Sequence, residues 1–546
     1  MKFLRYFSVT LILVMLATSL CSCRASFFYV VSSWLSEHSQ EESLRENVFL
    51  KSLEPSISEA DIRMVRDSIE RCKASCFAEN KDAARFEEDL YAMKAALACI
   101  DSKRDVAKLL FDYDTLDAEA QENRRYAYEI YYQLHSEYWS AINEMQNHAD
   151  DLLSVVQAFL EQEYPNRRTL LFDNDAYLAQ MDVLYSDFCT YNFEGTPQEI
   201  HGIYTEYLKA AQMYAESYGY ENYYECETDW TYCRDYGRSE RELFRTYVKQ
   251  YIVPLYKEYD ARSDEMYKKL GSFARYESDV YTHKAYDQFE ENYIYMYLES
   301  LPSSIGDRMR DAFEKGYIVI GDRLGSLNTA NVTDIGGTPV CYFCEEKLDL
   351  MSVSHELGHY CQNLIEDGAV GISYDMKEVC SQANTLLMLR YLREKIDRAA
   401  YDAFEIYEVS NLLYQTILET AKDEFDEIVF ADPEAYTYTV EELTSIMEGL
   451  IEEYGIDEIG GSMEQYAKTY WHRQGLYQPA YRLSYATSAL MAFQLYRIAD
   501  GDYAAATEKY RLFVETVDTD SSFLVAIENA GLYSPFDEKM YLDFMG

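Results

Sequence analysis

The chain has 546 residues, 48% of them hydrophobic, and 96 acidic against 49 basic residues give a formal net charge of −47 at pH 7. This length accommodates two or three average domains or one large one. A surface this acidic repels phosphate backbones and anionic headgroups, which argues against binding of nucleic acid or of a membrane surface. It would favour cationic substrates, although in most proteins acidity serves solubility alone.

The first 23 residues have the pattern of a secretory signal. Lys2 and Arg5 precede an apolar run, Phe7 to about Leu20, which is shorter than the roughly 20 residues of a membrane-spanning helix. The "LCSC" that follows resembles a bacterial lipobox, in which Cys23 would be lipidated. The sequence therefore predicts an extracytoplasmic protein at a bacterial cell surface, anchored as a lipoprotein. An uncleaved anchor and plain secretion are the alternatives.

From residue 55 onward the hydrophobic pattern is mainly helical. Apolar residues recur at three- and four-residue spacing, as in "ARFEEDLYAMKAALACIDSKRDVAKLLFDY", and the chain has only nine prolines, which suits long helices. The segment 316–346 departs from this pattern. Its "GYIVIGD" and "TPVCYFCEE" are short and rich in β-branched and aromatic residues, which predicts a small β-sheet. The fold class is therefore mainly α.

The helical segment 349–367 contains "SHELGHY". Residues four apart on a helix lie on the same face, so His355 and His359 can direct their imidazoles at one metal ion. Glu356 lies beside them, where a carboxylate can reach a water molecule at that ion. This H-E-x-x-H arrangement predicts a zinc site of a metallopeptidase.

A catalytic zinc site needs a third protein ligand. Glu378 follows His359 by nineteen positions, in "DMKEVCSQ" on the next predicted helix. It would complete a site of two histidines and one glutamate for one Zn²⁺ per chain. Asp375 is the second choice, and Glu366 and Asp367 are further candidates that lie on the motif helix itself.

These motifs resemble the oligoendopeptidase F and thimet oligopeptidase family of zinc metallopeptidases. The likeness includes "YRLSYATSALMAFQLY" and the closing "AIENAGLYSPFD", and it covers roughly residues 200 to 546. The resemblance implies a large two-lobed helical metallopeptidase with a deep substrate channel and a small sheet next to the motif helix. From the polarity and periodicity along the chain we expect a tether over 24–54, an N-terminal helical lobe over 55–200 and a catalytic domain over 201–546.

The resemblance also assigns roles to individual residues. His355, His359 and Glu378 would bind zinc, and Glu356 would be the general base. Tyrosines and one histidine of the C-terminal segment would stabilise the oxyanion or bind substrate; they are His472, Tyr477, Tyr481 and Tyr485.

The segment "PVCYFC" resembles the edge strand that pairs with substrate backbone in such enzymes. Cys341, Tyr342 and Phe343 would then bind the peptide, although an ordinary sheet strand is an equal alternative. Three features depart from the family pattern. Gln362 replaces a frequent histidine, Thr385 replaces a frequent glutamate, and His472 lies farther from the tyrosine of "YA" than the corresponding histidine of the oligoendopeptidase F branch. None of these is a zinc ligand or the base, so they bear on substrate preference and rate.

The leading hypothesis is a zinc endopeptidase that hydrolyses short unstructured oligopeptides outside the cytoplasm. One rival is a surface lipoprotein that captures peptides without cutting them. Another is a zinc carboxypeptidase, in which Arg473 or Arg482 would hold the substrate carboxylate. Oligopeptides are the expected partners, with no nucleic acid, and with contact to a membrane only through the N-terminal anchor or an uncleaved signal.

Overall fold

Capping residues mark where several of the helices begin in the computed structural model. The hydroxyls of Ser58, Thr196 and Thr439 each accept a hydrogen bond from a backbone N–H in the first turn of α4 (Glu59–Cys76), α9 (Pro197–Ser217) and α19 (Val440–Glu453). In each case an acidic side chain at the third helical position bonds back to the cap. Such reciprocal capping satisfies amide groups that otherwise lack partners at a helix start.

The structure describes residues 52–114, 117–163, 196–270, 293–321, 330–344, 349–366, 371–396, 398–459, 467–476, 478–517 and 522–545, with Phe49 and a few positions between 177 and 188. Its other helices and strands are α5 (Ala83–Tyr113), α6 (Ala118–His148), α7 (Leu153–Glu163), α10 (Tyr223–Trp230), α11 (Arg238–Tyr247), α12 (Val253–Leu270), α14 (Tyr293–Ser300), α15 (Ser303–Glu314), β1 (Ile318–Gly321), β2 (Ala330–Asp334), β3 (Pro339–Cys344), α16 (Leu350–Glu366), α17 (Tyr374–Leu392), α18 (Arg398–Phe430), α20 (Ile456–Ile459), α22 (Tyr470–Arg473), α23 (Arg482–Gly501), α24 (Tyr503–Thr516), α25 (Phe523–Asn529) and α26 (Glu538–Met545).

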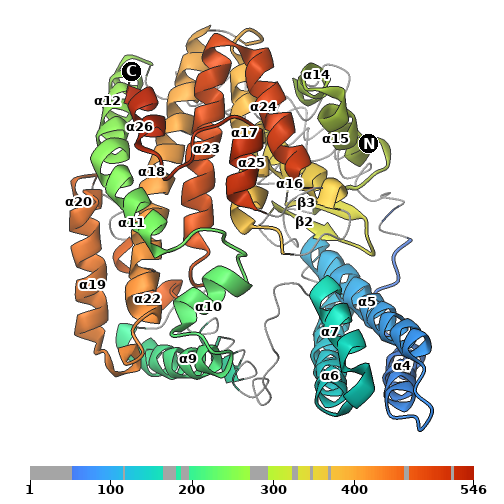
Figure 1. Cartoon of the computed structure of the whole chain (residues 1–546). Helices are drawn as coiled ribbons and strands as arrows, with labels where there is room; N and C mark the ends of the chain where they lie inside the picture. The colour runs from blue at the N-terminus through green and yellow to red at the C-terminus, as the bar shows by residue number, and fades with distance from the viewer. Residues whose placement is uncertain are drawn as a thin grey trace, which may run out of the picture. The chain divides into compact units, whose positions relative to one another are not determined.

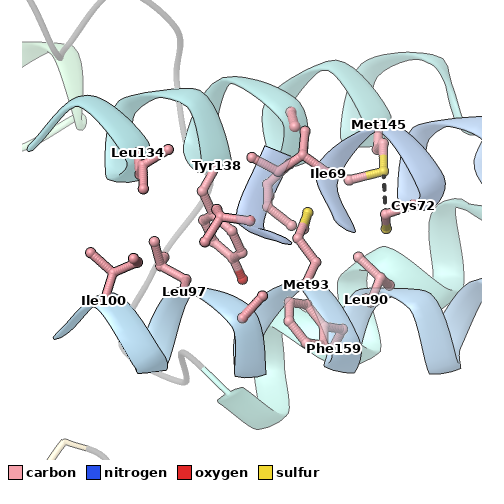
Figure 2. Close-up of a cluster of buried hydrophobic side chains, with 14 of the residues drawn as sticks. Ile69, Cys72, Leu90, Met93, Leu97, Ile100, Leu134, Tyr138, Met145 and Phe159 are labelled. Carbon is pink, nitrogen blue, oxygen red and sulfur yellow. Dashed lines mark hydrogen bonds between the residues drawn. The ribbon is translucent and has the colours of Figure 1, made fainter. Parts of the chain in front are cut away.

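The helices α4 to α7 pack around a hydrophobic core of their own (Figure 2). The Cys72 thiol of α4 lies 3.7 Å from the Met145 sulfur of α6 and donates to it. Side chains from all four helices meet here because each helix repeats apolar residues every three or four positions. The labelled members of this core are Ile69, Leu90, Met93, Leu97, Ile100, Leu134, Tyr138 and Phe159.

A three-stranded sheet precedes the motif helix α16, as the sequence predicts. The strand order is β1-β3-β2, with β1 parallel and β2 antiparallel to β3. All six residues of β3 are buried. The sheet packs on α16, and the Cys341 thiol approaches the backbone oxygen of Glu356 at 3.9 Å. The sheet therefore supports the motif helix next to the residues of the motif.

Four helices pack one against the next beside the motif. The motif helix α16 packs on α17, α17 packs on α23, and α23 packs on α18 (Figure 1). Gly358 of α16 permits the first of these contacts. A Cβ atom at this position would lie 2.4 Å from the carbonyl oxygen of Cys380 and 2.6 Å from the Cα of Ser381. The missing side chain therefore lets α16 and α17 approach at their backbones.

The mainly helical fold class and the small sheet beside the motif helix are thus confirmed. By backbone contacts the chain divides into two units, Met1–Leu53 and Glu54–Gly546, and the elements above belong to the second. The expected boundaries at 23 and 200, the two lobes and the deep channel stay predictions. No helix within the described ranges combines the length and the apolarity that crossing a membrane requires. Cys23 lies outside the described residues.

Candidate active site

Three side chains from α16 and α17 converge on one point. One donor atom from each of His355, His359 and Glu378 lies within 4.8 Å of the others. The two imidazole rings are 5.0 Å apart between centroids, and His359 Nε2 is 3.7 Å from Glu378 Oε2. Burial lowers the pKa of both histidines to about 4. They are therefore neutral near pH 7, which is the state that binds a metal ion.

Glu356 lies next to this group and is only 6% exposed. Its Oε2 atom is buried without a hydrogen-bond partner among the described residues. Burial and the nearby charge of Glu378 raise the pKa of Glu356 to about 8. Two neighbouring buried carboxylates without a cation are costly, and a divalent cation would offset that cost. The donor set of two imidazoles and one carboxylate fits zinc, with a coordination position left for a reactant.

Tyr481 connects the C-terminal segment to this group. Its hydroxyl donates a hydrogen bond to Glu378 Oε1. Its ring packs between Tyr232, stacked at 5.7 Å, and Tyr374, edge-on at 5.9 Å. The ring of Tyr485 lies 4.8 Å from that of Tyr481. Two of the four predicted C-terminal residues are therefore brought to the metal group, one by a direct hydrogen bond.

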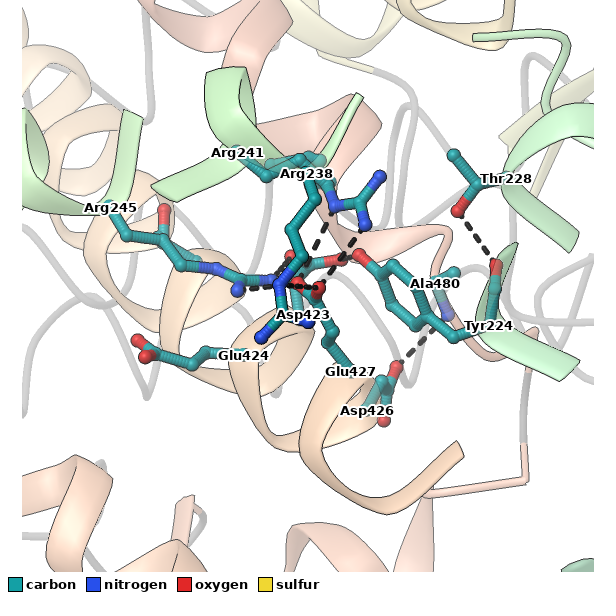
Figure 3. A network of polar contacts seen from close by, with 12 residues as sticks. Tyr224, Thr228, Arg238, Arg241, Arg245, Asp423, Glu424, Asp426, Glu427 and Ala480 are labelled. Atoms are coloured by element: carbon teal, nitrogen blue, oxygen red, sulfur yellow. Dashed lines mark hydrogen bonds and ion pairs between the residues drawn. The ribbon is translucent and has the colours of Figure 1, made fainter. Parts of the chain in front are cut away.

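The backbone just before Tyr481 has an unusual conformation. Gln478 and Ala480 both have positive φ, +50° and +65°, a region that side chains other than glycine rarely adopt. Asp426 accepts the Ala480 N–H at 3.1 Å, as Figure 3 shows, and Arg234 donates to the Ala480 carbonyl at 2.7 Å. A buried ionisable side chain thus binds each side of the residue that precedes Tyr481, and this fixes the direction in which Tyr481 leaves the backbone.

Arg234 also explains why Asp375 is not free to bind a metal. Both side chains are fully buried, and they form an ion pair at 3.3 Å. Asp375 further accepts a hydrogen bond from Tyr236 at 3.1 Å and one from Thr487. The second-choice ligand therefore has a structural role at the start of α17.

The two candidate ligands on the motif helix do not displace Glu378 either. Glu366 forms an ion pair with Lys377 at 3.2 Å, so a cation of the protein already balances its charge. Asp367 lies outside the described residues. Glu378 is therefore the acid that the structure brings to the two histidines.

No feature of the sequence indicated the roles of Arg234 and Asp426. Arg234 lies 141 positions before its partner Asp375, and Asp426 lies 54 positions before its partner Ala480. No motif distinguishes either of them from other charged residues. Asp426 belongs to an acidic stretch of α18 that faces the arginines of α11 (Figure 3). There Arg245 donates to Asp423 at 2.7 Å and Arg241 donates to Glu427 at 3.1 Å. This buried network joins α11 to the helix that carries Asp426.

Of the two remaining predicted residues of the C-terminal segment, the structure describes only His472. His472 is buried on α22, and no hydrogen bond or ion pair within the described ranges connects it to the metal group; its Nδ1 is buried without a partner there. Burial and the neighbouring Arg473 lower the pKa of His472 to about 4. Tyr477 lies outside the described residues.

The expectation that 339–344 offers a free strand edge to substrate is wrong. β3 is the central strand, and its residues Cys341, Tyr342 and Phe343 are paired with β1 on one side and β2 on the other. Backbone pairing with a peptide requires an unpaired edge. The side chains of these three residues are fully buried as well, so they form part of the sheet core.

A cavity of about 340 Å³ opens beside the metal group. His355 and Tyr485 line it together with residues of α17, α18 and α23. Arg482, which the sequence suggested as a carboxylate-binding residue, also lines it. The guanidinium of Arg482 lies 3.6 Å from Glu419, and both side chains are about one-tenth exposed. Its positive charge is therefore balanced within the protein.

Comparison with solved structures shows where this fold occurs. Pz peptidase A, solved with an inhibitor, superposes with a TM-score of 0.66 over 91% of this chain and 98% of its own, at 16% identity. A Bacillus anthracis protein described as an oligoendopeptidase F gives a TM-score of 0.64 at 15% identity, over 88% and 94% of the two chains. Oligoendopeptidase F from Enterococcus faecium gives 0.51 at 13% identity, over 89% and 96%.

This chain has the oligoendopeptidase F fold. The resemblance predicted from the sequence is therefore confirmed at the level of the fold, over nearly the whole chain. No protein-family model and no curated protein sequence matches the chain. The identity of 13–16% means that the roles of individual residues must be argued from the geometry of this site.

Proposed function

We propose that this protein is a zinc-dependent endopeptidase that hydrolyses short, unstructured oligopeptides. The observation that carries the proposal is the convergence of His355, His359 and Glu378 beside the buried, unpartnered Glu356. These four side chains occur on a fold shared with Pz peptidase A and oligoendopeptidase F. Oligopeptides are therefore the substrates we expect.

Each residue has a distinct task in the proposed reaction. When bound, zinc supplies Lewis-acid activation of the attacking water and of the peptide carbonyl. Glu356 takes a proton from the attacking water and passes it to the leaving amine. The Tyr481 hydroxyl, which donates to Glu378 Oε1 without substrate, turns to donate a hydrogen bond to the oxygen of the cleaved carbonyl as negative charge develops there. Tyr485 lines the adjoining cavity and contacts the substrate.

Hydrolysis of internally quenched peptides of about ten residues tests this assignment. We expect cleavage between internal residues, its loss with a zinc chelator, and recovery when zinc is restored. Glu356→Gln should lower kcat by about 10²–10⁴-fold, the contribution typical of a general base, with one equivalent of zinc retained. Glu366→Gln is the matched control, because it makes the same change on α16 in a residue that pairs with Lys377.

The outcomes separate the rivals. A zinc-loaded protein that binds these peptides and leaves them intact would instead be a peptide-binding lipoprotein. Release of single residues from the C-terminus alone would make it a carboxypeptidase. The balance of Arg482 by Glu419 in the cavity favours the endopeptidase over that second rival.

We further propose that the protein acts outside the cytoplasm, anchored to the bacterial membrane through Cys23. The sequence of the first 23 residues supports this, since a basic start, a short apolar run and "LCSC" together resemble a lipoprotein signal. Expression in a bacterial host followed by fractionation tests it. We expect the wild type in the membrane fraction with a labelled acyl chain, and Cys23→Ala without the label.

A further inference from the structure

Apart from His355 of α16, the cavity beside the metal group is lined by one face of each of three helices. From α17 it takes Gln382, Thr385 and Leu386, which follow the predicted ligand Glu378 by four, seven and eight positions. These positions share a face with Glu378. At a rise of 1.5 Å per residue, the cavity wall therefore runs about 12 Å along α17 from the metal group.

The other two helices form the rest of the wall. α18 contributes a stripe with helical spacing, and α23 contributes residues three and four positions apart. Apolar parts of the wall come from Leu386, Leu412 and Ala489. The polar lining residues from these two helices are Glu408, Asn411, Gln415, Glu419, Arg482 and Tyr485.

The two carboxylates of the wall differ in their partners. Glu419 lies 2.8 Å from Lys422 and 3.6 Å from Arg482, so cations of the protein already balance it. Glu408 is partly exposed to the cavity, and the structure gives it no ion pair or hydrogen bond within the described residues. Burial, together with the charge of a second acid, Asp349, raises the pKa of Glu408 to about 8. A basic side chain that entered the cavity would therefore meet a carboxylate that no cation of the described residues already balances.

We propose that this cavity is a substrate subsite for the side chain of arginine or lysine close to the cleaved bond, with Glu408 as the residue that determines specificity. The apolar wall takes the aliphatic part of the side chain, which is how long basic side chains are commonly buried. The charged end pairs with Glu408, and the amides of Asn411 and Gln415 offer further acceptors. The proposal rests on the proposed function, since it concerns the same site.

The negative charge of the whole chain also favours peptides with basic side chains. A net charge of −47 raises the local concentration of cationic peptides and speeds their association. This effect does not select a position in the peptide. The subsite does, because a carboxylate inside a cavity with apolar walls discriminates strongly between a charged side chain and a neutral one of equal shape.

The test compares quenched peptides that differ at one position, scanned across three residues on either side of the cleaved bond. The residue at that position is arginine, its neutral isostere citrulline, or glutamate. At one position we expect kcat/KM to be at least tenfold higher for arginine than for citrulline in the wild type, and this ratio to fall to about one in Glu408→Gln. Asp402→Asn is the matched control. It removes a charge from the same helix at a residue that pairs with Arg398, away from the cavity, and should keep the ratio.

Failure of the subsite and failure of the peptidase are distinguishable. Cleavage with equal kcat/KM for arginine and citrulline at every position, or a ratio unchanged by Glu408→Gln in a protein of wild-type Tm, overturns the subsite and leaves the peptidase standing. Binding of the same peptides to Glu356→Gln, followed by fluorescence anisotropy, does not require catalysis. Tighter binding of the arginine peptide there supports the subsite even if no peptide is cut, and equal binding overturns it.

Discussion

At the scale of single residues, the site depends on polar groups that are buried and arranged around one another. Glu378 accepts a hydrogen bond from Tyr481 on one oxygen and lies 3.3 Å from the Ser381 hydroxyl on the other. His355 and His359 stay neutral near pH 7 because burial opposes their protonation. Such an arrangement holds its geometry before substrate arrives, which is what electrostatic stabilisation of a transition state requires.

The Tyr481 hydroxyl can be removed without disturbing the ring that carries it. Tyr481→Phe takes away one hydrogen-bond donor beside Glu378 and leaves the ring packed on Tyr232. We expect kcat to fall by about 10²–10³-fold, the loss typical of an oxyanion donor, with KM and zinc content little changed. Steady-state kinetics and metal analysis measure this.

Tyr374→Phe is its control, because that ring contacts Tyr481 edge-on without a hydrogen bond to the metal group among the described residues. We expect it to keep most of the wild-type kcat. An equal loss in both variants would mean that the fall in kcat does not depend on the place of the Tyr481 hydroxyl beside Glu378.

At the scale of elements, the distance between α16 and α17 decides whether the three ligands can meet. His355 and His359 are on the first helix and Glu378 is on the second. Gly358 lies between the two histidines, where its missing side chain allows backbone contact with Cys380 and Ser381. The close approach of the helices and the geometry of the metal group therefore depend on one residue.

Gly358→Ala should separate the two helices, since the added Cβ meets backbone atoms that cannot move alone. We expect a loss of about 1–3 kcal/mol in the free energy of unfolding, as is usual for overpacking, and at least tenfold weaker zinc binding. Urea unfolding and metal titration measure the two effects. Gly449→Ala, on α19 with open space around its Cβ, should instead stabilise by about 0.5–1 kcal/mol. Unchanged zinc affinity in Gly358→Ala would refute the explanation.

Arg234 connects the start of α17 to the segment that leads into α23. Arg234→Met would leave the fully buried Asp375 without its cation, which costs about 3–5 kcal/mol for a buried pair. Adding Asp375→Asn should recover part of that stability, as measured by urea unfolding. It should not recover kcat, because the Ala480 carbonyl still lacks its donor and Tyr481 is less well directed. Recovery of both together would show that Arg234 serves stability alone.

At the scale of the whole molecule, several acids are buried where ionisation is costly. Burial raises the pKa of Glu227 to about 7, and burial with the charge of Asp423 raises the pKa of Asp426 to about 8. Unfolded carboxyl groups have pKa values near 4. Between about pH 4 and the raised pKa of each buried acid, the folded state therefore holds a proton that the unfolded state has released. The free energy of unfolding therefore falls as the pH rises through this window. Histidines with lowered pKa, such as His472, act in the opposite sense, but only between about pH 4 and 6.5.

Stability should therefore decrease from pH 6.5 to pH 8. In this interval the buried acids titrate in the folded state and these histidines no longer do, so the urea midpoint should be lower at pH 8 than at pH 6.5. One group that keeps its proton only in the folded state contributes about 1.4 kcal/mol per pH unit. Asp426→Asn, which is uncharged at every pH, should show a smaller decrease than the wild type. A midpoint that rises from pH 6.5 to 8 would contradict this account.

Local features of the whole molecule were predictable from the sequence. Helical class, the position of the sheet and the facing pair His355 and His359 follow from residues a few positions apart, because periodicity and helix geometry are local. Glu378 was predictable as the third ligand because it lies on the next helix along the chain, and the structure brings its carboxylate to the two imidazoles.

Three other features depend on tertiary contacts: which strand of the sheet is central, which acid near the motif is paired, and where the cavity lies. The composition of β3 predicts a strand, but its neighbours β1 and β2 are set by pairing between separate segments. Asp375 and Glu378 are only three positions apart. Asp375 forms an ion pair with Arg234, which lies in a loop far away in the sequence, whereas Glu378 faces the two histidines and can bind a metal. Long-range pairs of this kind depend on packing of the whole chain. The residues next to a charged or aromatic side chain in the sequence do not indicate which distant residue it will contact.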